Sequence, residues 1–310
     1  MKRYFTVPAA ILFLFALLGC EDNQELSRSI PDPGKTITHA AGETVVPENP
    51  ERVVALDNIA LDSVIALDVE PVGALINENT GEFPVHLRER ITDTTRRLAS
   101  SEQDLERITQ LEPDLIIGGK NVESAYEQLN QIAPTILLGE SGTTAWKDKL
   151  LLTAEALGDP DRGQELLDEY NENTSDLASR IEEPSDIEVS IVRVFPDGLR
   201  LYQNETFVGG ILNDVGLSRP SSQDKDQLWD NISLERAEEA DGDAVFVWSL
   251  GEEADRAYEQ LQEDPLWASL DAVQAGNVYS VPGYWIGRGP IAADEVLNDL
   301  ERYLVDERDD

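Results

Sequence analysis

The feature that most constrains this chain is a regular alternation between short apolar runs and segments whose apolar residues recur at helical spacing. The runs expected to form strands are 53–56, 71–76, 115–118, 135–138, 187–195, 198–202, 244–248 and 278–281. The segments expected to form helices are 61–67, 105–111, 126–132, 209–215, 235–240 and 291–304. Strands that alternate with helices in this way predict α/β units around parallel sheets, with 198–202 as the hairpin partner of the strand before it.

Residues 146–181 differ from the rest, because they show helical periodicity and little sign of strands. The periodicity is broken at residues 158–160, Gly-Asp-Pro, and we expect a long helix from about residue 161 to about residue 183. At 1.5 Å per residue this helix would be about 35 Å long, enough to brace two lobes. The predicted boundaries are a first α/β lobe at 51–144, an interlobe helical region at 145–184 and a second α/β lobe at 185–310.

The two predicted lobes repeat a short pattern. In the first lobe a Glu-Arg pair begins at Glu106, eight residues before Asp114, which opens a predicted strand. In the second lobe Glu235 and Asp243 stand at the same spacing before another predicted strand. A repeat of this kind implies two similar lobes that face each other.

The N-terminus has the organisation of a secretory signal peptide. Lys2 and Arg3 precede an apolar run at 9–18 that is too short to span a bilayer. Residues 17–20, Leu-Leu-Gly-Cys, resemble a bacterial lipobox, whose cysteine is lipidated and becomes the first residue of the mature chain. We therefore expect residues 1–19 to be removed.

Cys20 is the only cysteine of the chain, which excludes an internal disulfide. A lone cysteine is ordinarily a buried thiol, but directly after a signal-like segment we expect lipidation. The acyl chains would then hold an otherwise soluble, extracytoplasmic protein at a membrane. Residues 20–50 are polar and contain four prolines, so we expect a tether that ends in an edge strand at 36–39.

The charge of the chain excludes one class of partner. There are 62 acidic and 24 basic residues, for a formal net charge of -38. A nucleic acid would be repelled, so we exclude it as a partner. Such an acidic, lysine-poor chain is typical of a salty medium, where screening relieves self-repulsion. A need for solubility alone would give the same charge, and composition does not choose between the two explanations.

Several segments together resemble the substrate-binding proteins of ABC importers for iron siderophores and cobalamin. They are residues 50–56, 104–118, 131–135, 193–220, 264–267 and 278–304. The resemblance covers nearly the whole chain after Cys20 and is carried by the order and spacing of the segments. It implies a class III periplasmic binding protein of the helical-backbone metal-receptor type, in which two Rossmann-like lobes joined by one long helix bind the ligand in a cleft. It also implies a monomer without enzymatic activity that delivers a ferric siderophore to an ABC permease and its ATPase.

A site for a bare metal ion is not expected. Such a site needs clustered His, Cys or carboxylate ligands, and the chain has only His39, His86 and the lipidated Cys20. His39 falls in the predicted tether, and we expect His86 on the surface. A ferric siderophore brings its own oxygen ligands, so the protein would need no cofactor, only aromatic walls and a few cations.

The resemblance implies a ligand-binding segment between the last strand and the last helix. There Tyr284 and Trp285 would supply an aromatic wall against the chelate, and Arg288 would meet negative oxygens at a helix start. The alternative is that Trp285 packs in the core and Arg288 pairs with a surface acid.

Further candidates follow other predicted strands. Arg193 and Tyr202 lie on the first strands of the second lobe, and Trp248 ends a later one, where α/β cores open to ligands. In the first lobe Asn58 and Lys120 follow the strands at 53–56 and 115–118, so we expect them to face the same cleft.

Two exposed acids have a candidate role in docking. In the resembling family one glutamate on each lobe contacts arginines of the permease, and Glu106 and Glu235 occupy equivalent positions in the repeat. The alternative is that both are acids favoured by a helix N-terminus.

The siderophore class is left open between hydroxamate, citrate-type and catecholate. Relatives that bind hydroxamates have an arginine just before the Asp-Leu-Glu motif, where this chain reads Leu-Ala-Ser-Ser at 98–101. Arg96 and Arg97 lie nearby but are out of register.

Cobalamin and haem remain alternative ligands, with His86 as a haem ligand, and an extracytoplasmic bilobal hydrolase is an alternative from another class. Residues 287–292 satisfy the GxGxxA pattern of dinucleotide enzymes, but no strand with an acid for the ribose follows. Residues 222–225 satisfy SxxK without the partner motifs of penicillin-binding enzymes. Acids are plentiful, yet no two stand at a distinctive catalytic spacing.

Overall fold

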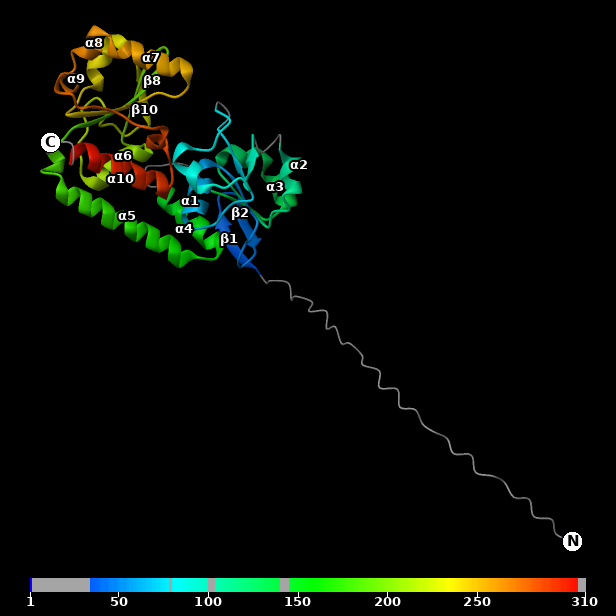
Figure 1. Ribbon diagram of the computed structural model, residues 1–310. Helices are drawn as coiled ribbons and strands as arrows, with labels where there is room; N and C mark the ends of the chain where they lie inside the picture. Colours follow the sequence, from blue (N-terminus) through cyan, green and yellow to red (C-terminus); the bar gives the residue numbers. More distant parts are fainter. Residues whose placement is uncertain (2–33, 78–79, 100–103, 140–144, 306–310) are drawn as a thin grey trace. The chain divides into compact units, whose positions relative to one another are not determined.

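The computed structural model describes Met1 and residues 34–77, 80–99, 104–139 and 145–305 (Figure 1). The chain divides into two units, Met1–Asp32 and Pro33–Asp310, and only the second is considered below. The lipidation site Cys20 lies outside the described residues, as does nearly all of the signal peptide. Within the described part, no helix is both long and apolar enough to span a bilayer.

The first lobe is built on a five-stranded parallel sheet with the strand order β5-β4-β3-β6-β7. Its strands are β3 (Val53–Leu56), β4 (Gly73–Leu75), β5 (Arg96–Leu98), β6 (Leu115–Gly118) and β7 (Thr135–Leu137). The helices of this lobe are α1 (Asn58–Ala66), η1 (Val85–Arg90), α2 (Leu105–Gln110), η2 (Lys120–Ala125) and α3 (Tyr126–Ile132). The central strands β3 and β6 are buried at every position, as expected for uninterrupted apolar runs covered on both faces.

The second lobe has a mixed sheet with the order β10-β9-β8-β11-β12. Its strands are β8 (Val189–Phe195), β9 (Gly198–Tyr202), β10 (Trp229–Ile232), β11 (Ala244–Trp248) and β12 (Val278–Ser280). Strands β8, β11 and β12 are parallel, and β9 forms the predicted antiparallel hairpin with β8. The helices are η3 (Pro184–Asp186), α6 (Phe207–Val215), η4 (Leu234–Ala240), α7 (Glu252–Gln262), α8 (Pro265–Ala268), α9 (Asp271–Ala275), η5 (Gly283–Ile286) and α10 (Pro290–Leu304).

The repeated aspartates have the same structural role in both lobes. The carboxylate of Asp114, just before β6, accepts hydrogen bonds from the backbone N–H groups of Glu51 and Arg52, just before β3. The carboxylate of Asp243, just before β11, accepts one from the N–H of Glu188, just before β8. Each aspartate therefore satisfies a backbone donor that precedes the neighbouring central strand.

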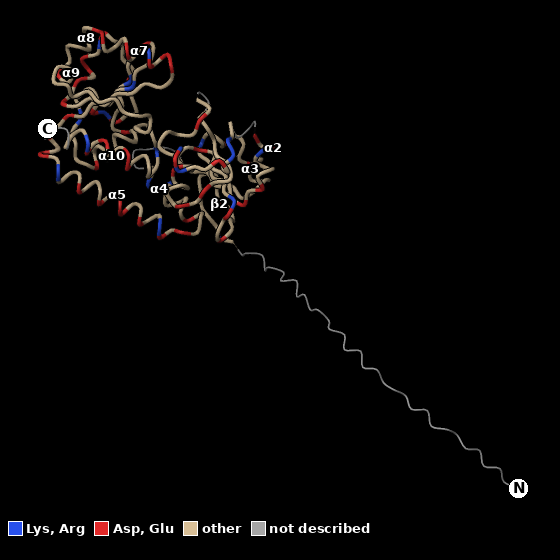
Figure 2. The backbone as a smooth tube through the Cα atoms, viewed as in Figure 1, with Lys and Arg blue, Asp and Glu red and all other residues tan. Residues whose placement is uncertain are grey.

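The long predicted helix is α5 (Pro160–Arg180), which runs along one side of both lobes after α4 (Ala145–Leu157) (Figure 1). Its start follows from local chemistry, because Pro160 occupies the first turn and the Asp159 carboxylate accepts a hydrogen bond from the N–H of Arg162. Many of its residues are acidic (Figure 2) and exposed, whereas Leu167, Tyr170 and Leu177 are buried in the shared core. At 21 residues, it is about 31 Å long.

The two lobes share one hydrophobic core. Apolar side chains of α1, α4, α5, α6 and α10 pack together with the inner faces of both sheets, and each lobe has a smaller separate cluster on its outer side. Moving the lobes apart would expose this shared core, at a cost of about 25 cal/mol for each Å² of apolar surface. The fold is therefore the predicted one, with two Rossmann-like α/β lobes joined by one long helix.

The prediction of a tether over residues 20–50 is wrong for its second half. Strands β1 (Lys35–His39) and β2 (Gly42–Val46) form an antiparallel hairpin that packs on β7. Ile37 and Val46 are buried in the shared core. The predicted edge strand exists, but its partner β2 was not predicted. The side chains of both strands are buried only where the hairpin packs on β7 and α4, which are distant in sequence.

His39 anchors this hairpin. Its Nδ1 accepts hydrogen bonds from the backbone N–H groups of Ala41 and Leu137, which leaves Nε2 to donate to Thr44. Burial lowers the pKa of His39 below its ordinary value of 6.5. The folded protein thus holds the ring neutral.

We expect the stabilisation that His39 provides to disappear at acid pH. Because the folded pKa lies below that of the unfolded chain, only the unfolded chain takes up this proton as the pH falls below about 6.5. The free energy of unfolding of the native chain should exceed that of His39→Leu most at pH 8, and the difference should narrow toward pH 5. Urea unfolding followed by circular dichroism measures it, and a gap that does not change with pH would contradict the expectation.

Candidate functional site

Two adjoining cavities lie between the lobes, next to the carboxyl ends of β3 and β11. The arginine cavity, of about 240 Å³, is lined by Ile59, Ala145, Trp146, Lys149, Arg193, Arg200, Tyr202, Glu205, Thr206, Phe207, Leu228, Trp229, Trp285, Ile286 and Arg288. The interlobe cavity, of about 530 Å³, is lined by Asp57, Asn58, Ile59, Asp62, Asn77, Thr80, Phe83, Pro84, Val85, His86, Arg88, Trp248, Leu250, Pro282, Gly283, Tyr284, Ile286, Gly287 and Arg288. Ligands of open α/β sheets bind at such strand ends.

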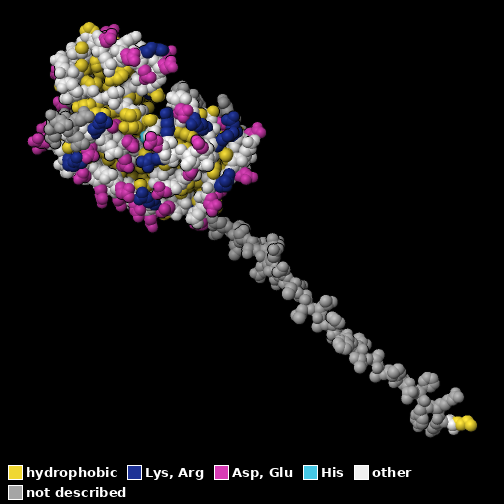
Figure 3. Space-filling view, viewed as in Figure 1, with side chains coloured by type: hydrophobic (Ala, Val, Ile, Leu, Met, Phe, Trp, Pro, Cys, Tyr) yellow, Lys and Arg dark blue, Asp and Glu magenta, His cyan; other side chains and the backbone are white. Residues whose placement is uncertain are grey.

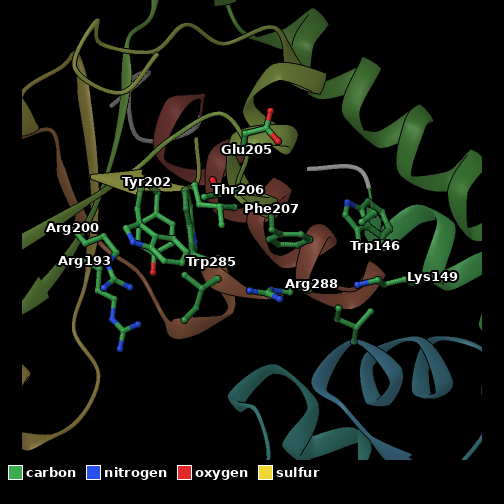
Figure 4. Close-up of a pocket in the computed structure, with 15 residues that line it drawn as sticks. Trp146, Lys149, Arg193, Arg200, Tyr202, Glu205, Thr206, Phe207, Trp285 and Arg288 are labelled. Carbon is green, nitrogen blue, oxygen red and sulfur yellow. The ribbon is translucent and has the colours of Figure 1, made fainter. Parts of the chain in front are cut away.

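The arginine cavity gathers positive charge in an acidic protein. Among the described residues that line it, four are cations and one, Glu205, is an acid. Arg193 on β8 lies directly opposite Arg200 on β9, so both side chains extend from the same face of the sheet, while Arg288 and Lys149 approach from other elements (Figure 4). Like charges opposite each other in a sheet are destabilising, so this pair favours an anion between or beside its members.

Aromatic rings lie against these guanidinium groups. The Cζ atoms of Arg193 and Arg200 are 4.5 and 4.7 Å from the ring centre of Phe195. Arg200 is also 4.7 Å from the ring centre of Trp229, which is 41% exposed and lies opposite Tyr202 in the β9–β10 pairing. These contacts hold the cations in place without neutralising them.

Sequence reasoning identified Arg193 and Tyr202 but missed Arg200 and Trp229. Arg200 carried a signal, because it stands two residues before Tyr202 on a predicted strand and must share its face. Trp229 carried none, since β10 is mostly exposed and polar and was not predicted as a strand.

Trp285 lines the arginine cavity but packs in the core, which is the alternative considered from the sequence. The side chain is 0% exposed, and its ring stacks on Phe246 at 4.4 Å with an interplanar angle of 21°. Its Nε1 donates to Asp299 at 2.8 Å. Trp285 therefore supports the floor of the arginine cavity from the core.

Trp248 is buried as well. Only 1% of it is exposed, and its ring lies 5.0 Å from that of Tyr202. Its Nε1 is buried without a hydrogen-bond partner among the described residues. It borders the interlobe cavity, so its place at the end of β11 is the predicted one.

The segment after β12 is held by one carboxylate. Asp299 on α10 accepts hydrogen bonds from the Tyr284 hydroxyl and from Trp285, both at 2.8 Å. Burial, together with this carboxylate, raises the pKa of Tyr284. Arg288 is exposed and borders both cavities, as a ligand-binding cation requires.

The first lobe contributes fewer of the predicted residues to the two cavities than the second lobe does. Asn58 lines the interlobe cavity, but Lys120 is exposed and lines neither cavity. The reason lies in the turn after β6, where Asn121 rather than Lys120 bonds back to the Leu56 carbonyl at the end of β3.

His86 is not on the surface as expected. Its side chain is 6% exposed, and its Nε2 lies 2.9 Å from Asp62 Oδ2. That hydrogen bond engages Nε2, so this nitrogen is not free to bind a haem iron. Among the described residues no group of three or more His, Cys, Asp or Glu side chains is arranged to hold a metal ion.

The SxxK motif is explained by the structure. Ser222 donates its hydroxyl proton to the Glu239 carbonyl at 2.6 Å, so the SxxK pattern has no nucleophile aimed at its lysine.

The two candidate docking acids are both exposed. Glu106 lies in α2 of the first lobe and Glu235 in η4 of the second. Hydrogen bonds from Ser233 and from its own backbone lower the pKa of Glu235, which keeps it ionised.

The visible face of the folded unit is hollowed between the lobes, where hydrophobic and basic side chains gather, and acidic side chains cover much of the rest (Figure 3). The described residues thus place a cationic, aromatic cavity in the expected cleft. They bring together Arg193, Tyr202 and Arg288 around one cavity, and Asn58, Trp248 and Tyr284 around its neighbour.

Comparison with known proteins agrees with this architecture. A model of the periplasmic binding protein family matches residues 53–284. The chain is 33% identical to the probable siderophore-binding lipoprotein YfiY of Bacillus subtilis, over 98% of this chain and 99% of that protein. It is 30% identical to the Fe(3+)-citrate-binding protein YfmC of the same species, over 87% of each. Staphylococcus aureus SirA, solved in complex with staphyloferrin B, superposes with a TM-score of 0.74 at 26% identity, over 87% of this chain and 98% of that one. The chain therefore belongs to the periplasmic binding protein family.

Proposed function

We propose that this protein captures an anionic ferric siderophore in the arginine cavity and delivers it to an ABC permease. The observation that carries the proposal is the pair of neighbouring guanidinium groups, Arg193 and Arg200, set among aromatic rings in a chain of net charge -38. The names of the relatives and of the SirA complex support the same function.

Among siderophore classes we favour the citrate type. A guanidinium matches a carboxylate in two parallel hydrogen bonds, and a ferric citrate complex presents several carboxylates. A neutral hydroxamate complex would not offset the repulsion between Arg193 and Arg200. The similarity to an Fe(3+)-citrate-binding protein supports this choice.

The protein then has no catalytic role and no cofactor of its own, since the iron is cargo held by the siderophore. The Ser222 hydroxyl of the SxxK pattern is engaged in a structural hydrogen bond. We place it as a monomer on the extracytoplasmic side, anchored through lipidated Cys20. Glu106 and Glu235 would dock on the permease, which works with its ATPase.

Removing a cavity guanidinium should weaken binding of ferric citrate. Arg200→Ala and Arg193→Ala should each raise the Kd by about tenfold to a hundredfold, the effect of losing a charge-assisted hydrogen bond. Arg256→Ala, an exposed cation on α7 paired only loosely with Glu252, is the control and should not change the Kd. Isothermal titration measures all three, and equal Kd values for all of them would contradict the proposal.

Two of the three tryptophans that line the arginine cavity, Trp285 and Trp229, should differ in what they do. Trp285→Ala should lower the free energy of unfolding by about 3–5 kcal/mol, because it empties a buried site. Trp229→Ala should leave stability nearly unchanged and should remove much of the fluorescence quenching by ferric citrate. Urea unfolding and fluorescence titration separate the two effects. A Trp229→Ala variant that is quenched and binds like the native chain would place the ligand elsewhere.

The docking role predicts transport loss without affinity loss. In Glu106→Ala/Glu235→Ala the Kd for ferric citrate should be unchanged while iron uptake by cells falls several-fold. The matched control is Glu127→Ala/Glu259→Ala, which also removes one exposed acid from each lobe. Uptake that falls equally in both double variants would mean that net charge, and not these two positions, governs docking.

A further inference from the structure

Asp62 is a buried carboxylate that joins the two lobes. It belongs to α1 of the first lobe, is 2% exposed, and lies within the shared core. Its oxygens accept hydrogen bonds from the backbone N–H groups of Ile291 and Ala292, at 2.9 and 3.2 Å, in the first turn of α10. His86 Nε2 lies 2.9 Å from the same carboxylate. Burying a carboxylate is costly unless its hydrogen-bonding partners are all present. The groups around Asp62 meet this condition.

Helix α10 depends on this contact because it has no cap of its own. Its N-cap is Gly289, which offers no side-chain acceptor, and its first residue is Pro290. Helices α1, α5 and α6 are each capped by the residue that precedes them, Asp57, Asp159 and Thr206. The first turn of α10 instead receives a carboxylate from α1, and a negative charge there also meets the positive end of the helix dipole.

The glycine before α10 is required by the same contact. A Cβ at Gly289 would stand 2.3 Å from Cγ and 2.5 Å from Cβ of Asp62, closer than atoms can approach. The backbone of the second lobe therefore touches α1 directly. This accounts for the second glycine of the GxGxxA pattern, which sequence analysis could not connect with a ligand.

Both ends of the contact carry residues of the candidate site. On α1, Asn58 and Ile59 lie one turn before Asp62 and line the cavities. On the other side, Arg288 directly precedes Gly289 and lines both cavities. One carboxylate thus sets the position of Arg288 relative to the wall that the first lobe contributes.

We propose that Asp62 is a positioning residue, which holds Arg288 in its ligand-binding place by tethering the start of α10 to the first lobe. It need not touch the ligand. Its effect on affinity comes from preorganisation, since an untethered Arg288 must be ordered when the ligand binds. The inference rests on the proposed function only in naming the ligand.

The first test compares Asp62→Asn with the native chain. The amide keeps the size but presents one acceptor where two N–H groups need partners, so we expect the Kd for ferric citrate to rise by about tenfold, mainly through faster dissociation. Asp159→Ala is the control, because it removes a carboxylate cap from α5 outside the two cavities. Unchanged binding by a folded Asp62→Asn chain would overturn the proposal.

The second test separates tethering from helix capping. Exchanging the two residues, as Asp62→Gly with Gly289→Asp, removes the side chain that a Cβ at position 289 would meet and gives α10 a cap from its own N-cap position. Relative to Asp62→Gly alone, we expect the exchange to recover thermal stability without recovering affinity. If affinity recovers together with stability, Asp62 is only a cap and the proposal fails.

A third measurement does not need a ligand. Spin labels at Glu127→Cys on α3 and Glu259→Cys on α7, with Cys20→Ser, report the distance between the lobes. The distribution should be narrow in the native background and broader in both Asp62→Gly and the exchange variant. Equal widths would overturn the tether. If the native chain fails to bind ferric citrate, the proposed ligand is wrong, while this measurement still decides the role of Asp62.

Discussion

The hydrophobic core that the two lobes share is the constraint on which the rest of the structure depends. Helices α1, α4, α5, α6 and α10 bury their apolar faces against one another and against both sheets. Because opening the cleft would expose this surface to water, the cavity walls keep nearly fixed positions. A ligand must then be recognised by side chains that are already in place, and affinity depends on how well those side chains are held.

Hydrogen-bonded acids do much of this holding, from the buried Asp62 to the exposed Asp214. Asp214 accepts hydrogen bonds from Lys147 and Tyr170, both at 2.8 Å, and so links α4 and α5 to α6. Asp299 holds the segment around η5, and Asp62 holds the start of α10. Each of these carboxylates has at least two donors, and for the buried Asp62 this is the condition under which its charge is tolerated.

Much of the fold could be predicted because its strands and helices are encoded locally. The strand at 244–248, the hairpin strand at 198–202 and the helix at 126–132 have the predicted bounds. The strands that were missed, β2, β5 and β10, are short and mostly exposed, and their place in a sheet depends on packing against distant segments, so no local period reports them. The same cause made residues 35–46 look like a tether.

The sequence by itself determined the family, the two lobes and the long helix, because these follow from periodicity and motif order, and it offered Arg193 and Arg288 as candidate ligand-binding cations. Only the tertiary structure decided that Trp285 packs in the core and that Arg200 and Trp229 line the cavity. Exposure and cross-strand register depend on neighbours far away in sequence, which no local pattern contains. The tether of Asp62 to α10 is of the same kind, since it joins residues more than 200 positions apart.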